Sequence, residues 1–198
     1  MKKKNMNGRL KMKLFKVLFI LMVSVVMFSG FWSGKSDLEL RQERLDTGKE
    51  TLEYLYKYAP ESKQMIEKAY GYATFSNLGV NLFLISAEGG KGVAHNNQTG
   101  QNIYMNMASG GIGLGLGAKD FRIVFIFENE EVYNRFVTYG WEANAQVDAA
   151  AKAGKDGGAL NGAVTIEPGL RIYKLTQNGL ALQVTIQGTK YWKDGDLN

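Results

Sequence analysis

The stretch FRIVFIFE, residues 121–128, has apolar side chains at six of its eight positions. Successive residues of a strand point to opposite faces of a sheet, so a run of consecutive apolar residues is apolar on both faces. This pattern is typical of a strand that is covered on both sides. We therefore predict that residues 121–128 form a central strand of a β-sheet.

Further strands are predicted on both sides of this segment. Residues 79–87, GVNLFLISA, and residues 101–108, QNIYMNMA, both have the period of a strand. Between them, the glycines at 89, 90 and 92 and the sequence His95-Asn96-Asn97 have the composition of turns. Residues 141–150 alternate between apolar and polar side chains, which favours a strand even though their alanines favour a helix. Residues 154–162 are predicted to be a glycine-rich loop.

A β-hairpin is predicted around Asn178 and Gly179. This dipeptide suits the two positive-φ positions of a type I′ turn, which places Gln177 opposite Leu180. The same register places Leu175 opposite Leu182, so that one face of the hairpin is apolar and the other is polar.

Three segments are predicted to be helical. Residues 37–58 have leucines at helix-compatible spacing among charged residues, although Gly48 weakens a helix by about 1 kcal/mol relative to alanine. This helix either packs on the domain or forms a solvated linker. Pro60 ends it and starts a short helix that reaches about Tyr70, and residues 130–139 form a third helix. The leucines of the first helix are Leu38, Leu45, Leu52 and Leu55.

The first 34 residues have the layout of an export signal. Seven basic residues precede or begin a stretch that is uncharged from Val17 to Gly34. This arrangement is typical of a cleaved signal peptide, and its length also suits an uncleaved membrane anchor. We expect an exported, periplasmic or otherwise extracytoplasmic protein, with a tether to the inner membrane as the alternative. The seven basic residues are Lys2, Lys3, Lys4, Arg9, Lys11, Lys13 and Lys16.

The leader accounts for the basic character of the chain. Of 24 basic and 19 acidic residues, seven basic and no acidic ones lie in residues 1–34, so the rest has 17 basic against 19 acidic residues and a net charge of −2. A slightly acidic domain gives no support to nucleic acid as a partner. The absence of cysteine excludes disulfides, thiolate metal sites and cysteine-linked lipids.

Glycine recurs at every second position from Gly111 to Gly117, through Gly113 and Gly115. On a strand these four residues would share one face of bare backbone, against which another element or a ligand lies closely. Neither glycine frame of the common phosphate-binding loops fits the spacing. Close backbone packing and ligand contact therefore remain the two interpretations.

The sequence contains little that could carry catalysis. His95 is the only histidine, so a serine triad could use no other base, and zinc ligands are equally scarce. Three carboxylates cluster at Glu128, Glu130 and Glu131, and at the start of a helix they are explained by its dipole. We expect no catalytic residues, no metal and no cofactor.

An ordered set of glycines and aromatic residues resembles the SYLF-domain family over roughly residues 61–198. The resemblance implies a compact, β-rich α+β domain that binds phospholipid head groups or membrane surfaces without catalysis. Together with the hairpin, it leads us to expect a mainly antiparallel, strongly twisted or barrel-like β-sheet with a few flanking helices. The matching residues are Lys68-Ala69, Ala73-Thr74-Phe75, Gly79, Gly89-Gly90-Lys91-Gly92, Gly110 to Gly117, Val124 to Phe127, Phe136, Trp141, Ile172-Tyr173, Asn178-Gly179-Leu180 and Gln187-Gly188-Thr189-Lys190.

The expected organisation is a leader at residues 1–34, a helical lead-in segment at 35–60 and a SYLF-like domain at 61–198. If lipid is bound, the cations available near the turns are Lys68, Lys91, Lys119 and Arg122. The leading hypothesis is a non-enzymatic exported protein that binds phospholipid or membrane surfaces. The alternative is a structural or protein-interaction module of the cell envelope, with a protein partner and no lipid ligand.

Overall fold

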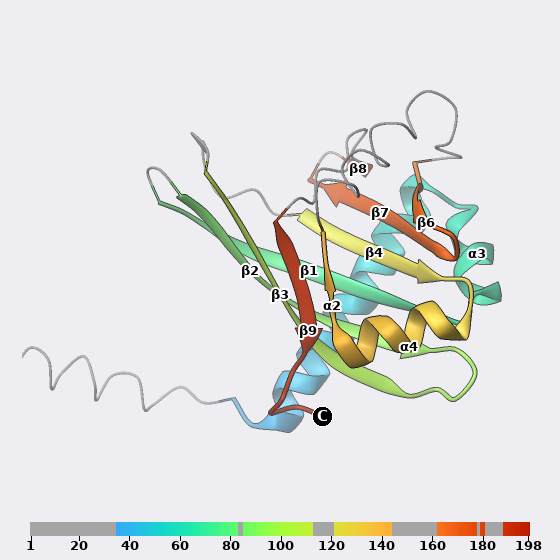
Figure 1. Ribbon diagram of the computed structural model, residues 1–198, viewed down its shortest axis with the longest axis horizontal. Helices are drawn as coiled ribbons and strands as arrows, with labels where there is room; N and C mark the ends of the chain where they lie inside the picture. The colour runs from blue at the N-terminus through green and yellow to red at the C-terminus, as the bar shows by residue number, and fades with distance from the viewer. Residues whose placement is uncertain (1–34, 83–84, 113–120, 144–161, 178, 181–187) are drawn as a thin grey trace, which may run out of the picture. The chain divides into compact units, whose positions relative to one another are not determined.

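The computed structural model describes residues 35–82, 85–112, 121–143, 162–177, 179–180 and 188–198. The chain divides into two units, Met1–Ser36 and Asp37–Asn198. The second unit contains every described helix and strand, and the account below concerns this unit (Figure 1).

Strand β4, Phe121–Phe127, lies inside the sheet between β1, Gly71–Leu82, and β7, Leu170–Thr176. It is almost wholly buried, which confirms the predicted central strand. Its alternate residues contribute to two different cores. Ile123, Phe125 and Phe127 face one side of the sheet, and Val124 and Ile126 face the other.

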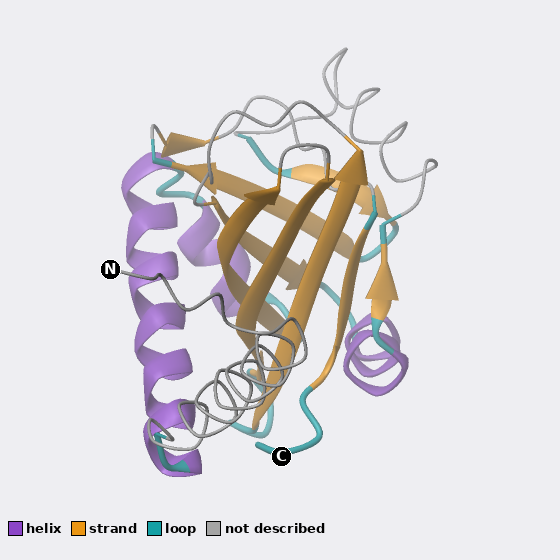
Figure 2. Cartoon of the chain, turned by 90° about the vertical axis from the view of Figure 1, so that its left-hand side faces the viewer, coloured by secondary structure: helices purple, strands orange, loops and turns teal. Residues whose placement is uncertain are grey.

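The described strands form one antiparallel, strongly curled sheet. Its order is β5-β9-β3-β2-β1-β4-β7-β6, and β8 pairs with β7. Figure 2 shows the strands wrapping into a half-barrel, with α2 running along its outside. The predicted α+β class with a barrel-like antiparallel sheet is confirmed. The remaining strands are β2 (Ile85–Asn96), β3 (Asn102–Ile112), β5 (Trp141–Glu142), β6 (Val164–Glu167), β8 (Gly179–Leu180) and β9 (Thr189–Lys193).

The strands of the β1–β2 hairpin differ from the sequence prediction. The predicted strand at 79–87 is two strand ends rather than one strand, because residues 79–82 end β1, residues 85–87 begin β2, and Leu82 pairs with Ile85. The predicted turn residues from Gly89 to Asn96 instead belong to β2. A Cβ atom at Gly92 would lie 2.3 Å from Cδ1 of Phe75 and 2.4 Å from the carbonyl oxygen of Thr74. Gly92 is therefore a strand residue that makes room for a core ring.

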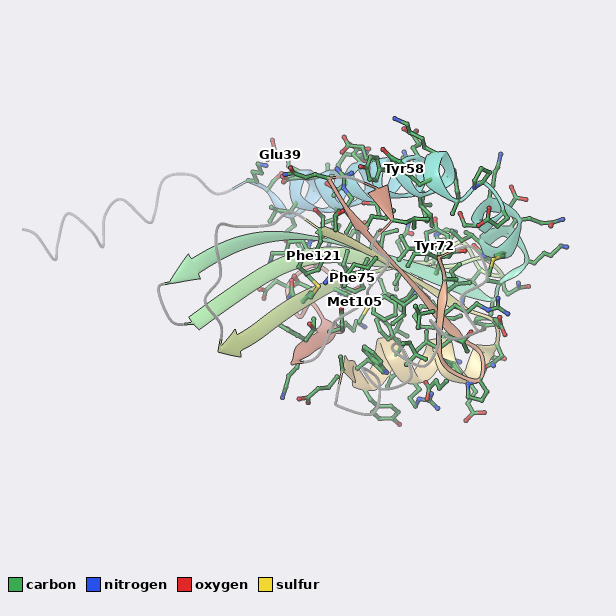
Figure 3. All side chains as sticks on the ribbon, turned by 90° about the horizontal axis from the view of Figure 1, so that it is seen from above. Glu39, Tyr58, Tyr72, Phe75, Met105 and Phe121 are labelled. Carbon is green, nitrogen blue, oxygen red and sulfur yellow. The ribbon has the colours of Figure 1, made fainter. Side chains whose placement is uncertain are left out.

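Two cores lie on opposite faces of the sheet. The first contains an aromatic cluster beneath α4, in which Phe125 packs edge-on against Phe75 and Tyr191 at ring-centre distances of 5.8 and 4.9 Å. The second lies beneath α2 and α3 and contains Leu55 and Tyr173. Figure 3 shows α2 and α4 on opposite sides of the sheet.

Helix α2, Asp37–Tyr58, has the predicted bounds and packs on the sheet, but its buried face is not the leucine stripe. Leu38 is 74 % exposed, whereas the buried residues are Arg44, Gly48, Thr51 and Leu55. A Cβ atom at Gly48 would lie 2.9 Å from Oγ1 of Thr74. The glycine that weakens the isolated helix therefore allows close contact with β1. Helix α3, Ser62–Lys68, follows as predicted.

Helix α4, Glu130–Tyr139, also has the predicted bounds. Asn129 begins it, because its side-chain oxygen accepts a hydrogen bond from the amide of Val132 at 3.0 Å. Within the predicted strand at 141–150, Trp141 and Glu142 form β5. Residues 144–161, including most of the predicted glycine-rich loop, lie outside the described part of the chain.

The hairpin that follows β7 has a different register from the predicted one. Thr176 pairs with Gly179 and Leu175 with Leu180, so the predicted pairing of Gln177 with Leu180 is wrong. Gly179 begins β8 with φ of 102°, and a Cβ atom there would lie 2.9 Å from the ring of Tyr58. The close approach of α2 therefore explains this glycine. Residues 181–187, with their predicted pairings, are outside the described segments.

Candidate functional site

A row of side chains crosses the α2 face of the sheet on four neighbouring strands. The backbone register aligns Ser76 of β1 with Lys91 of β2, Lys91 with Asn106 of β3, and Asn106 with Trp192 of β9. Because neighbouring strands are separated by about 4.8 Å, this row spans about 14 Å. Residues distant in the sequence are thus assembled by register alone.

The N-terminal half of α2 stands beside this row and encloses a cavity of about 630 Å³. Known small-molecule sites have volumes of about 300–1,000 Å³, so the cavity is large enough for such a ligand. Its lining is amphipathic, with more apolar than polar surface. The lining residues are Leu40, Glu43, Arg44, Thr47, Ser76, Gly89, Gly90, Lys91, Asn106, Met107 and Trp192.

Lys91 brings a positive charge to the cavity floor. Its Nζ donates a hydrogen bond of 3.0 Å to Oδ1 of Asn106. This acceptor is a neutral amide oxygen. Across the described residues, no carboxylate forms an ion pair with Lys91. Glu43 supplies one carboxylate to the lining from α2.

Arg44 holds the helical wall of the cavity against the sheet. Its side chain is only 7 % exposed, and its Nη2 lies 2.5 Å from Oδ2 of Asp194. It also donates to the carbonyl oxygen of Met105 at 2.9 Å and to Oδ1 of Asn106 at 3.4 Å. Asn106 therefore accepts hydrogen bonds from both cations of the cavity.

Asp194 ties the segment after β9 into the same network. Its Oδ1 accepts hydrogen bonds from the amides of Asp196 and Leu197, and Arg41 donates to the carbonyl oxygen of Leu197 at 2.8 Å. Burial alone would raise the pKa of the Asp194 carboxyl. Hydrogen bonds from Arg44 and from the backbone outweigh burial and hold this pKa below its ordinary value.

Trp192 places a large amphipathic ring at the cavity. Its side chain is 42 % exposed, whereas its neighbour Tyr191 is buried in the aromatic core on the other face. The alternation of β9 therefore sends one ring into the core and the next toward the cavity. An indole that is both exposed and next to an amphipathic cavity is suited to contact with a bound ligand or a lipid interface.

Of the lysines and arginine proposed from the sequence, the three described ones, Lys68, Lys91 and Arg122, do not line one cavity. Arg122 lies on the same row as Lys91, across Ser76, but its guanidinium sits 5.3 Å from the ring centre of Tyr54. Lys68 lines a separate groove of about 240 Å³ near the ion pair of Arg171 with Glu128. Lys119 is outside the described residues.

The glycines proposed from the sequence are only partly described. Gly111 lies near the end of β3 and pairs with Ser86, and Gly179 contacts α2 as described above. Gly113, Gly115 and Gly117 lie outside the described residues. The alternatives for the glycine strand are therefore both retained.

The residues that could have supported an enzyme are each engaged with a different partner. Glu128 pairs with Arg171, and Glu131 lies 3.9 Å from Arg135. His95 is on β2 rather than in a loop, and its Nδ1 lies 2.8 Å from Oδ1 of Asn102. No group of three or more histidine or acidic residues suited to a metal occurs among the described residues.

Sequence reasoning missed Arg44, Gly89 and Trp192. Arg44 is one of the charged residues among the leucines of the first predicted helix, and it shares a helical stripe with Gly48, Thr51 and Leu55, at spacings of four, three and four residues. That spacing is the signal that could have identified it as facing the sheet. Gly89 and Trp192 line the cavity because of the register between strands, and no pattern in the neighbouring sequence predicts this register.

Fold and site together define an α+β protein with an amphipathic cavity between a surface helix and a curled antiparallel sheet. No protein-family model matches the chain. It is 38 % identical over 143 residues to beta cell expansion factor A of Aeromonas veronii, across 72 % of this chain and 53 % of that protein. The chain thus spans about half the length of the curated relative that it matches. No helix in the described part of the chain is long and apolar enough to cross a membrane.

Proposed function

We propose that this chain is an exported, non-enzymatic protein that binds phospholipid or membrane surfaces through a SYLF-like domain. The observation that carries the proposal is the amphipathic cavity beside α2, with the exposed Trp192 at its side and Lys91 on its floor. Lys91 donates a hydrogen bond to a neutral amide and forms no ion pair with a carboxylate of the described residues. A cation near an amphipathic aromatic ring suits the boundary between lipid head groups and acyl chains.

One further observation supports the proposal. The leader has the layout of an export signal, which would bring the domain to a membrane.

Vesicle sedimentation tests the proposal. Residues 35–198 should sediment with vesicles that contain phosphatidylglycerol and remain in the supernatant with pure phosphatidylcholine. Reversing the charge with Lys91→Glu should weaken binding about five- to thirty-fold, because each basic residue near an anionic surface contributes about 1 kcal/mol. Binding should also weaken as salt is added.

Lys63→Glu is the matched control, because Lys63 is an exposed lysine on α3 outside the cavity lining. Equal losses for Lys63→Glu and Lys91→Glu would mean that general charge, rather than the cavity, drives binding. If vesicles of every composition leave the domain in the supernatant, the proposed function is wrong. Recovery of a protein without lipid from membranes would instead favour an envelope interaction module.

A further inference from the structure

The geometry of the cavity points to a more specific ligand: we propose that it binds one single-chain anionic amphiphile, with a carboxylate or phosphate head at Lys91 and an alkyl chain along the apolar lining. This inference rests on the proposed function and deepens it. Adhesion to a membrane surface needs only exposed cations, whereas the cavity offers a concave site for one molecule between α2 and the sheet.

The head group is assigned from the polar floor. Lys91 has a neutral amide oxygen as its partner, so its ammonium retains donors for an anion. The hydroxyl of Ser76 is the neighbour of Lys91 on the next strand and lines the same cavity. Arg44 is engaged with Asp194 and shapes the site rather than supplying a free charge.

The alkyl chain is assigned from the remaining lining. Leu40 comes from α2 and Trp192 from β9, and Gly89 leaves the floor open between strands. A Cβ atom added at Gly89 would meet nothing within 4 Å. Gly89 lies two residues from Lys91, and alternation places both on the same face of β2. The free space therefore begins next to the charged head-group position.

The volume accommodates one small amphiphile. A cavity of about 630 Å³ lies within the range of about 300–1,000 Å³ that small ligands occupy. The described lining provides one cation outside an ion pair and one apolar stretch, which matches one head and one chain. Glu43 lines the helical wall of the same cavity.

Photo-cross-linking tests the inference on the full chain. Dodecyl phosphate with a photoreactive group at the end of its chain is added below its critical micelle concentration, and adducts are mapped by mass spectrometry. We expect adducts on residues 40–47 of α2 and on the peptide that contains Trp192. Adducts on residues 1–34 are scored separately, because an apolar leader captures alkyl chains without a cavity.

Two variants and their controls test the contacts. Gly89→Leu should abolish the cavity adducts by filling the open space, whereas Gly195→Leu, at another open glycine outside the cavity, should preserve them. Lys91→Gln should weaken binding about ten-fold or more, because a charge-assisted hydrogen bond is lost. Lys63→Gln should have no effect. Circular dichroism confirms the fold of each variant.

Competition identifies the ligand chemistry. Unlabelled dodecyl phosphate and dodecanoate should displace the probe, while inorganic phosphate, dodecanol and dodecyltrimethylammonium should not. If inorganic phosphate displaces the probe equally well, the cavity binds free anions and the alkyl-chain assignment is wrong. If dodecanol and dodecyltrimethylammonium displace it equally well, the anionic head-group assignment is wrong. Cavity adducts that persist in folded Gly89→Leu would also overturn the inference.

Failure of the single-chain ligand can be distinguished from failure of the proposed membrane binding, because cross-linking tests the first and vesicle sedimentation tests the second. Vesicle sedimentation without cavity adducts would overturn the single-chain ligand and leave membrane binding in place. Cavity adducts without vesicle sedimentation would support the ligand site and contradict membrane binding.

Discussion

Arg44 has a structural role that the sequence alone does not indicate. In the sequence it is one of several charges on a polar helix, and in the structure it is buried against Asp194. Removing one partner of a buried ion pair leaves an uncompensated charge, which costs about 3–5 kcal/mol. We therefore expect Asp194→Ala to lower the free energy of unfolding by that amount, measured by urea denaturation.

The exposed pair of Lys190 with Glu142 provides the comparison for Asp194→Ala. Its Nζ and Oε2 atoms lie 3.1 Å apart, and both side chains are more than half exposed. Exposed ion pairs contribute about 0–1 kcal/mol. Glu142→Ala should therefore have little effect, and a similar cost for the two substitutions would contradict the role given to burial.

The same carboxyl predicts a dependence of stability on acid. Its pKa is lowered in the folded state, so the unfolded chain takes up the proton more readily and acidification favours unfolding. Ionised Asp194 makes its full contribution to the free energy of unfolding well above its ordinary pKa of 3.8. This contribution is lost as the pH falls through the lower pKa that the carboxyl has in the folded state. Urea midpoints between pH 7 and pH 3 should fall less steeply in Asp194→Asn than in the parent. Parallel profiles would exclude Asp194 as a source of acid sensitivity.

Thr74 carries a hydroxyl that is buried beneath α2 and has no hydrogen-bond partner within the described part of the chain. An unpaired buried polar group costs about 1–3 kcal/mol, and valine has nearly the same shape without the hydroxyl. Thr74→Val should therefore be neutral or stabilising by up to about 1–2 kcal/mol in thermal or urea unfolding. A loss of stability would show that the hydroxyl has a partner, such as a buried water.

At the scale of elements, α2 depends on its close approach to β1 at Gly48. A Cβ atom there would lie 2.9 Å from Thr74 Oγ1 and 3.2 Å from Val93 Cγ1. Gly48→Leu should force the helix away from the sheet and cost about 1–3 kcal/mol as overpacking, despite the better helix propensity of leucine. Lys49→Leu, on the exposed side of α2, is the control and should leave the unfolding midpoint nearly unchanged.

The helices were predicted with accurate bounds because their signals are local. Pro60, from which the end of α2 was predicted, follows Tyr58 by two residues. Asn129, which the prediction did not use, caps α4. The β1–β2 hairpin was missed because Gly92 serves the packing of Phe75 rather than a turn. Local composition cannot distinguish a packing glycine from a turn glycine, because Phe75, which needs the space at Gly92, lies 17 residues before it in the sequence.

At the scale of the whole molecule, the candidate cavity could be predicted only in part. Lys91 was proposed because it lies among glycines, and it does line the cavity. Its neighbours Ser76, Asn106 and Trp192 come from three other strands, and the opposite wall comes from α2. That assembly depends on sheet order and register, which are long-range properties of the fold.

The packing of α2 also makes a prediction about the folding unit. The helix buries Leu55 in the second core and supplies the cavity wall, so it belongs to the compact unit that begins at Asp37. Residues 37–198 should unfold in one cooperative transition that is the same by circular dichroism and by tryptophan fluorescence. Residues 61–198 should bind a hydrophobic dye and lack this transition, because Val124, Tyr173 and Leu175 lose their cover. Equal unfolding midpoints for the two pieces would show that α2 is an appendage, in which case the cavity cannot be a stable feature of the domain.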